Sequence, residues 1–168
     1  MCEAAGRVHI HTPTAADTEA LGGRLARSRP ADRFAWAVVY LKGELGSGKT
    51  TLARGFLQGL GITGPVRSPT YTLVELYPVA GITVVHADLY RLRAPAELES
   101  LGLREWAAPG HLWLVEWPEK GGARLPPPDL ALSFSAGTCG HDVEVSAPGS
   151  LGQAWLARLQ GAARASPG

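Results

Sequence analysis

The sequence predicts an α/β fold, in which the strands of a largely buried sheet alternate with helices. A continuous apolar run, 35–41 (AWAVVYL), and a second, largely apolar run, 111–117 (HLWLVEW), are typical of strands buried on both faces, as in a parallel sheet. Near the end of the chain, 130–135 and 142–146 alternate apolar and polar residues, which predicts an antiparallel hairpin with one exposed face. At 168 residues and 45% hydrophobic content, we expect one domain spanning 1–168.

The first strand and helix come from the N-terminal segment. Residues 7–12 (RVHIHT) alternate in polarity and predict a strand. The next segment, Thr14-Ala-Ala-Asp17, resembles a capping box with Asp in place of the preferred Glu or Gln. An apolar pair at i, i+4 then predicts a helix over about 14–28. The Gly22-Gly23 pair inside it weakens helix formation by roughly 1 kcal/mol for each glycine.

A glycine-rich segment follows the first buried strand. Residues 43–50 (GELGSGKT) match G-x-x-x-x-G-K-[ST] in full, and the apolar stripe after them predicts a helix over about 49–60. Glycines let successive N–H groups face a phosphate, and the helix N-terminus directs its positive end to the same point. Lys49 supplies an ammonium for the β- and γ-phosphates, and Thr50 a hydroxyl for Mg²⁺. An ordinary glycine-rich turn is the alternative, but the strand, the helix and the lysine favour a nucleotide site.

The rest of the chain predicts further strands and two helices. Residues 70–77 and 82–87 are strand candidates that could pair as a hairpin, and Pro95 begins a short helix over 95–101. A closing helix is marked by an apolar series: Leu151, Trp155 and Leu159. We expect about 162–168 to form a frayed tail.

Two carboxylates stand where a phosphate-loop protein needs them. Asp88 directly follows the strand at 82–87, and Glu116 closes the run at 111–117. Groups that hold the metal and the attacking water lie at the ends of neighbouring strands in such proteins. We expect Asp88 to orient or deprotonate water, and Glu116 to hold Mg²⁺ directly or through water. The alternative for each is an exposed strand-end carboxylate.

Other polar and aromatic residues carry weaker signals. The loop after the phosphate-loop helix contains Ser68, Thr70, Tyr71 and Thr72, where nucleotide-hydrolysing switches place a hydroxyl that senses the γ-phosphate. Trp117 fits either the core or a position beside the site. Arg91, Arg93 and Arg104 fit either a basic edge or, more simply, a solvated face. His86 and His111 lack partners at ligand spacing, which favours ordinary strand residues.

Composition excludes several classes of protein. A formal net charge of +1 gives no general attraction for nucleic acid. No apolar run reaches the roughly 18 residues of a membrane span. Two cysteines, Cys2 and Cys139, are too few for a disulfide framework. We therefore expect a cytoplasmic protein without a membrane partner.

Five blocks of sequence, in this order and spacing, resemble the TsaE (YjeE) family of small bacterial ATPases. The blocks are GELGSGKTTLARGFLQGLG, VRSPTYTLVELY, HADLYRL, ELESLGLREW and LVEWPEKG. The resemblance runs from about residue 12 to 122. It implies a P-loop NTPase-like three-layer fold with a mixed parallel and antiparallel sheet flanked by helices. It also implies a role in forming threonylcarbamoyladenosine beside the anticodon of ANN-decoding tRNAs.

The same resemblance implies the ligands, partners and site residues. The ligands are ATP and Mg²⁺, the partners are TsaB and TsaD, and tRNA is reached mainly through that complex. Lys49 and Asp88 are catalytic, Thr50 and Glu116 hold Mg²⁺, and Trp117 lies beside the site. The ATP-binding residues are Thr12, Thr14, Glu44, Leu45, Gly46, Ser47, Gly48, Lys49, Thr50 and Thr51. In two departures from the family pattern, Arg67 replaces a Lys before the SPTYT loop, and His141 stands where an Arg is expected.

Two other functions use the same phosphate loop. A non-catalytic assembly switch would bind ATP, order the SPTYT loop and dock a partner. A small-metabolite or nucleoside kinase would need an arginine-bearing lid and an acceptor pocket, and the segment 120–168 offers a hairpin and a helix instead. The sequence disfavours the kinase, but it does not separate the ATPase from the assembly switch, because both use the same residues.

Overall fold

The computed structural model describes residues 6–30 and 36–165. Seven strands form one sheet in the order β1-β7-β6-β2-β5-β4-β3. Strands β6, β2, β5 and β4 run parallel, whereas β7, β1 and β3 join at the two sides in antiparallel pairs. The mixed α/β sheet that the sequence predicted is therefore confirmed. The bounds are β1 Arg7–Thr12, β2 Ala37–Lys42, β3 Val74–Val79, β4 Ile82–Asp88, β5 His111–Glu116, β6 Leu130–Ala136 and β7 His141–Ser146.

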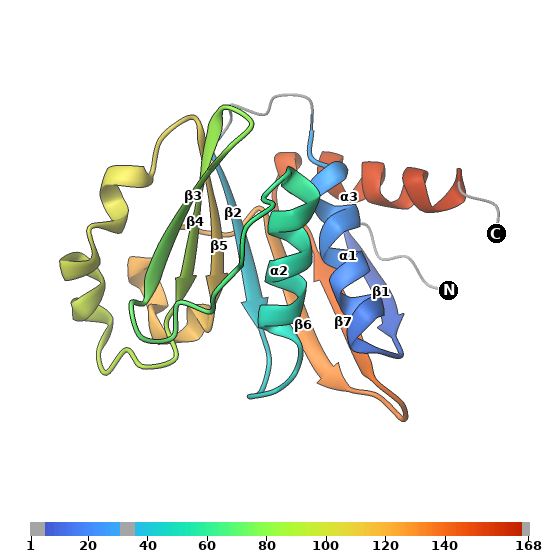
Figure 1. Cartoon of the computed structure of the whole chain (residues 1–168), viewed down its shortest axis with the longest axis horizontal. Coiled ribbons are helices and arrows are strands. Elements are labelled where there is room, and N and C mark those ends of the chain that lie inside the picture. Colours follow the sequence, from blue (N-terminus) through green and yellow to red (C-terminus); the bar gives the residue numbers. More distant parts are fainter. Residues whose placement is uncertain (1–5, 31–35, 166–168) are drawn as a thin grey trace.

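Three α-helices pack on the first of two cores, and short 3-10 helices pack on the second. Helices α1 (Ala15–Arg27) and α2 (Lys49–Leu60) lie side by side over the sheet (Figure 1). Helix α3 (Ser150–Arg164) packs on the same core through Trp155, whose ring lies 6.2 Å from that of Phe56 on α2. The Trp155 indole donates to Leu25 O at 2.8 Å. The 3-10 helices are η1 Pro95–Leu101, η2 Leu103–Trp106, η3 Pro118–Lys120 and η4 Gly122–Arg124.

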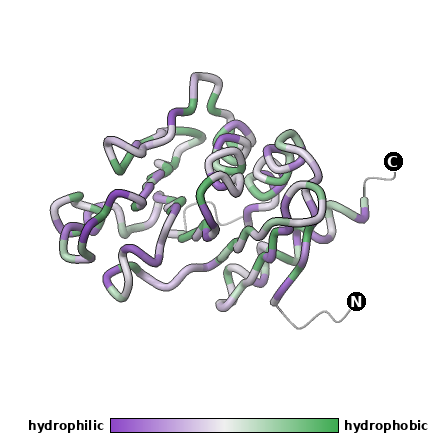
Figure 2. Tube along the Cα trace, turned by 90° about the horizontal axis from the view of Figure 1, so that it is seen from below, coloured by the Kyte–Doolittle hydropathy of each residue, from purple (hydrophilic) through white to green (hydrophobic). Residues whose placement is uncertain are grey.

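The central strands divide their side chains between the two cores with a period of two. On β5, Leu112 and Leu114 belong to the core under the α-helices, whereas Trp113 and Val115 belong to the core under the 3-10 helices. Burial on both faces is why these strands appear as continuous apolar runs in the sequence. Hydrophobic and hydrophilic residues are interspersed along the coloured part of the trace (Figure 2). Within the described ranges, no helix is long and apolar enough to cross a membrane.

Several boundaries differ from the sequence-based prediction. Strand β3 begins at Val74, not at residue 70, because Leu73 N donates to Pro69 O (2.6 Å) and closes a turn over the preceding residues. Strand β5 ends at Glu116, since Trp117 adopts a left-handed conformation with φ 56°. The short helix predicted over 95–101 is present with these bounds, as a 3-10 helix. Helix α3 extends to Arg164, into the segment expected to fray, and the predicted strand start at residue 35 lies outside the described residues.

Glycines let α1 and α2 approach each other closely. A Cβ atom added to Gly55 would lie 1.9 Å from Glu19 O, and one added to Gly22 would lie 2.2 Å from Leu52 O. Gly22, which weakens α1 as an isolated helix, is therefore required where the two backbones touch. This contact fixes α1 against α2. The phosphate loop leads directly into the first residues of α2, so the contact also positions that loop relative to α1.

Candidate nucleotide-binding site

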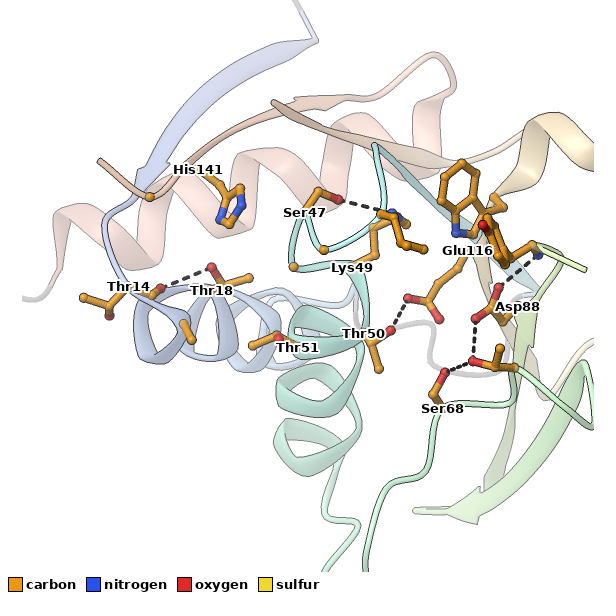
Figure 3. Close-up of a pocket in the computed structure, with 18 of the residues that line it drawn as sticks. Thr14, Thr18, Ser47, Lys49, Thr50, Thr51, Ser68, Asp88, Glu116 and His141 are labelled. Carbon is orange, nitrogen blue, oxygen red and sulfur yellow. Dashed lines mark hydrogen bonds between the residues drawn. The ribbon is translucent and has the colours of Figure 1, made fainter. Parts of the chain in front are cut away.

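A cavity of about 440 Å³ opens at the carboxyl ends of β2, β4 and β5. Its walls come from the phosphate loop, the start of α1, the SPTYT loop and the turn between β6 and β7 (Figure 3). In open α/β sheets, ligands bind in the crevice beyond the carboxyl ends of the strands. The cavity therefore lies where this kind of sheet places its ligand.

The phosphate loop joins β2 to α2 through left-handed glycines. Gly46 has φ 74° and Gly48 has φ 98°. A residue with a side chain would be strained in either conformation. Helix α2 begins directly afterwards at Lys49, and the loop from Leu45 to Thr51 lines the cavity. The strand, glycine turn and helix that the motif requires are all present.

Lys49 is held inside this loop. Its side chain is 5% exposed, and Nζ donates to Gly43 O at 2.6 Å, to Glu44 O at 2.7 Å and to Ser47 Oγ at 3.2 Å. Burial lowers the pKa of the Lys49 ammonium, and the nearby carboxylates, Glu116 first, oppose that shift. Nζ also lies 4.4 Å from the centre of the Trp117 ring. The cation is thus pre-oriented and partly desolvated, which strengthens its attraction for an anion.

Thr50 and Glu116 form a pair of oxygen ligands. Thr50 Oγ1 donates to Glu116 Oε1 at 2.8 Å, and Glu116 is 1% exposed. Magnesium is commonly bound by one or two side-chain oxygens together with substrate phosphates and water. The described residues contain no group of three or more His, Cys, Asp or Glu side chains that could hold a metal ion. The hydroxyl and carboxylate fit an Mg²⁺ ion that arrives with a nucleotide.

Asp88 joins the end of β4 to the SPTYT loop. It pairs in register with Glu116 on the neighbouring parallel strand. Its Oδ1 accepts from Tyr90 N at 3.0 Å, and its Oδ2 accepts from Thr70 Oγ1 at 3.3 Å. Burial raises the pKa of the Asp88 carboxyl group, while the Tyr90 hydrogen bond opposes the shift. A carboxylate that is easier to protonate is suited to act as a general base.

Two aromatic side chains and a second cation also line the cavity. The Trp117 and Tyr90 rings lie 5.0 Å apart between centres. Arg91 lines the cavity, and its guanidinium lies 4.3 Å from the centre of the Tyr71 ring. Lys49 and Arg91 are the Lys and Arg side chains among the described lining residues. Both can therefore face a phosphate.

The opposite end of the cavity is formed by α1 and the β6–β7 turn. Thr14 caps α1: its Oγ1 accepts from Asp17 N at 3.2 Å, and the Asp17 carboxylate accepts from Thr14 N at 3.0 Å. The predicted capping box is confirmed. His141 projects toward the start of α1, near Thr18 (Figure 3).

Comparison with known proteins gives the family. A family model described as "Threonylcarbamoyl adenosine biosynthesis protein TsaE" matches residues 12–142. The chain belongs to the TsaE family. This membership confirms the resemblance and places the chain in the biosynthesis of threonylcarbamoyladenosine in tRNA.

Relatives of this TsaE family member cover most of its length. The TsaE protein of Haemophilus influenzae is 47% identical over 116 residues, covering 69% of this chain and 73% of that protein. The TsaE protein of Streptomyces coelicolor is 36% identical over 140 residues, covering 80% and 91%. The crystal structure of YdiB from Bacillus subtilis matches with a TM-score of 0.73 and 26% identity, covering 94% of this chain and 96% of that one.

Most residues predicted from the sequence line the cavity of this TsaE family member. They are Thr14, Leu45, Gly46, Ser47, Gly48, Lys49, Thr50, Thr51, Ser68, Thr70, Asp88, Glu116 and Trp117. Four others do not line it. Thr12 is buried and donates to His141 O at 3.2 Å, and Glu44 contributes its carbonyl to Lys49. Tyr71 is 82% exposed, and Thr72 donates to Glu75 Oε1 at 3.1 Å.

Several lining residues of this TsaE family member were not predicted as site residues. They are Pro13, Ala15, Thr18, Tyr90, Arg91 and Gly140. Thr18 lies one turn after Thr14 on α1, so helical spacing could have indicated it. Tyr90 and Arg91 follow Asp88 directly, and Arg91 fitted a solvated face equally well. Gly140 comes from a distant hairpin, for which the sequence carries no local signal.

Proposed function

We propose that this chain is a Mg²⁺-dependent ATPase that drives or resets a TsaB–TsaD complex in the cytoplasm during tRNA threonylcarbamoyladenosine formation. The observation that carries the proposal is the pre-oriented Lys49 ammonium, 2.6 Å from Gly43 O, in a cavity shared with Asp88 and the Thr50–Glu116 pair. In this proposal tRNA is reached mainly through the partner proteins, in keeping with the near-zero net charge.

The phosphates of the nucleotide are assigned to one end of the cavity, and its adenine and ribose to the other. The phosphates lie on the loop N–H groups and the start of α2, where the helix dipole favours negative charge. Lys49 gives up its hydrogen bonds to the loop carbonyls and donates to phosphate oxygens instead. Adenine and ribose extend toward Thr14 and His141. We assign ATP rather than GTP from the family, since no guanine-specific group is apparent in the sequence.

Thr50 and Glu116 would hold the metal ion. When bound, Mg²⁺ supplies positive charge that neutralises the β- and γ-phosphate oxygens. Thr50 presents its hydroxyl from the first turn of α2, and Glu116 presents a buried carboxylate from β5. The chain's own contribution is to keep these two oxygens together at 2.8 Å before the ion arrives.

Asp88 is assigned to the attacking water. Its carboxylate orients the water and takes up its proton, and the raised pKa favours that step. Lys49 stabilises the negative charge that develops on the γ-phosphoryl group, and Arg91 is positioned to add to it. Trp117 and Tyr90 cover the same end of the cavity and restrict access of other water molecules.

A nucleotide-dependent assembly switch is the second candidate. The observation that favours it is the hydrogen-bond chain from Asp88 through Thr70 to Ser68, which links the cavity to the exposed Tyr71 loop. A ligand that alters the Asp88 end of this chain would alter the loop. A small-metabolite kinase is less well supported, because it would need an arginine-bearing lid. The described part of residues 120–168 instead forms η3, η4, the β6–β7 hairpin and α3.

Hydrolysis of ATP with and without TsaB and TsaD tests the proposal. The wild-type chain is compared with Lys49→Ala and Asp88→Ala, with and without Mg²⁺. Turnover that requires Mg²⁺, rises with the partners and falls in both variants supports the ATPase. Binding without turnover under every condition supports the assembly switch, and absence of nucleotide binding refutes both.

A further inference from the structure

His86 is a buried polar residue with no role in the mechanism so far. It lies on β4 two residues before Asp88 and is 0% exposed. Its Nε2 lies 3.2 Å from Glu116 Oε2, whereas its Nδ1 has no hydrogen-bond partner within the described part of the chain. A buried imidazole that leaves one nitrogen unpaired costs free energy that an apolar residue would avoid.

The neighbours of His86 in the sheet are apolar, so an apolar side chain would fit its position better. His86 pairs in register with Leu114 on β5, and Val84 two residues earlier belongs to the core under α1 and α2. Side chains two apart on a strand share a face, so His86 continues that apolar row. A role in packing alone would therefore be met better by leucine or valine.

The hydrogen bond to Glu116 explains why a histidine, rather than an apolar residue, stands at position 86. The tautomer with its hydrogen on Nε2 donates to Glu116 Oε2 and leaves only a lone pair unpaired at Nδ1. A hydrogen on Nδ1 would leave a buried N–H unpaired, at a cost of about 1–3 kcal/mol. Thr50 donates to the other oxygen, Oε1. The two oxygens of the Glu116 carboxylate are thus each fixed by a separate donor.

We propose that His86 is a positioning residue that fixes the orientation of the Glu116 carboxylate for Mg²⁺. The inference rests on the proposed function in taking Glu116 as a metal ligand. Thr50 is also a metal ligand in the proposed function, and its hydrogen bond to Glu116 Oε1 would weaken when its hydroxyl binds the ion. The His86 donor on Oε2 does not compete with the ion, because His86 comes from β4 and does not line the cavity. Partners of this kind typically raise metal affinity by about 10- to 100-fold.

Three variants separate positioning from packing. His86→Leu keeps an apolar side chain and removes the donor. His86→Gln places an amide N–H where Nε2 stands, so it should still reach Glu116. His86→Asn carries the same amide on a shorter side chain that does not reach. The Gln and Asn pair keeps the comparison valid if the Leu variant does not fold, and circular dichroism checks the folding of each.

The assay is metal binding rather than turnover. Binding of Mn²⁺, which accepts similar oxygen ligands, is followed by electron paramagnetic resonance with saturating ADP. Binding of ADP without metal is the control, since Lys49 and the loop, and not Glu116, contact the phosphates in the proposed site. We expect the Leu and Asn variants to bind Mn²⁺ about 10- to 100-fold more weakly, with unchanged metal-free ADP binding. The Gln variant should stay close to the wild type.

Each contrary result points to one cause. Wild-type Mn²⁺ affinity in the Leu and Asn variants would overturn the positioning role. Equal losses in the Gln, Asn and Leu variants, or a parallel loss of metal-free ADP binding, would also overturn it and indicate packing. If the wild type itself binds no Mn²⁺ with ADP, the metal site of the proposed function fails, and the His86 proposal fails with it. That failure is seen before any variant is compared.

Discussion

Replacing Gly55 by alanine should destabilise the fold, although alanine is the better helix former. The added Cβ would stand 1.9 Å from Glu19 O, where real Cβ contacts below 3.0 Å essentially never occur. Because the clash is with a backbone carbonyl, a side-chain rotation cannot relieve it, and α1 must move away by about 1 Å. Overpacking of this kind costs about 1–3 kcal/mol.

The expected magnitude follows from two opposing terms. Alanine in place of glycine favours the helix by about 1 kcal/mol. A gap of the size that α1 must open forfeits roughly a quarter to a half of the dispersion energy of the affected contacts. Taking the overpacking cost near its upper limit, we expect Gly55→Ala to lower the free energy of unfolding by about 2 kcal/mol. For a chain of this size that corresponds to a melting temperature lower by about 4–8 °C.

Gly161→Ala is the matched control. Gly161 lies on α3, and a Cβ there meets nothing within 4 Å. The same substitution should therefore raise stability by up to about 1 kcal/mol. Urea unfolding followed by circular dichroism measures both variants. If Gly55→Ala proves as stable as the wild type, or if both variants shift in the same direction, the argument from helix contact is refuted.

Four further outcomes test the site and its surroundings. Lys49→Ala should weaken ATP binding by about 10- to 100-fold in calorimetry, because charge-assisted hydrogen bonds worth about 1.5–3 kcal/mol are lost; unchanged affinity would exclude Lys49 from phosphate binding. Arg91→Ala should reduce partner-stimulated turnover at least about tenfold, whereas Arg93→Ala, exposed and away from the cavity, should not; equal effects would remove Arg91 from the mechanism. Chelation of Mg²⁺ should abolish turnover but leave residual nucleotide binding, and turnover that survives it would contradict the Thr50–Glu116 assignment. Burial raises the pKa of Asp129, whose carboxylate accepts from Val38 N at 2.8 Å. The stability that the Asp129 carboxyl group contributes is therefore greatest below its unfolded pKa of about 4 and is lost as pH rises through its folded pKa. The Asp129→Asn variant should therefore become more stable relative to the wild type as pH rises. A difference in unfolding free energy that stays constant with pH would refute the raised pKa.

Local patterns predicted the elements that build the site. The phosphate loop specifies its own conformation, since left-handed glycines and a following helix are encoded within a few residues. Asp88 and Glu116 were predictable because each ends a strand that is apolar enough to be recognised. The prediction was wrong at 70–73, where β-branched residues suggested a strand but a hydrogen bond from Leu73 N to Pro69 O forms a turn. That turn leaves Tyr71 outside the cavity.

The phosphate loop and the two strand-end carboxylates could be predicted from the sequence, because each depends on neighbours a few residues away. The family could be predicted because five blocks of sequence stand in its order and spacing. Which distant side chains meet the loop and the carboxylates depends on the tertiary structure. His86 and Glu116 are brought within 3.2 Å only by the parallel pairing of β4 with β5. Likewise, Gly22 and Gly55 weaken their own helices, and their value becomes visible only when α1 and α2 touch. Packing and hydrogen bonding between segments far apart in the chain have no local signature, so the support of the site could not be predicted from the sequence.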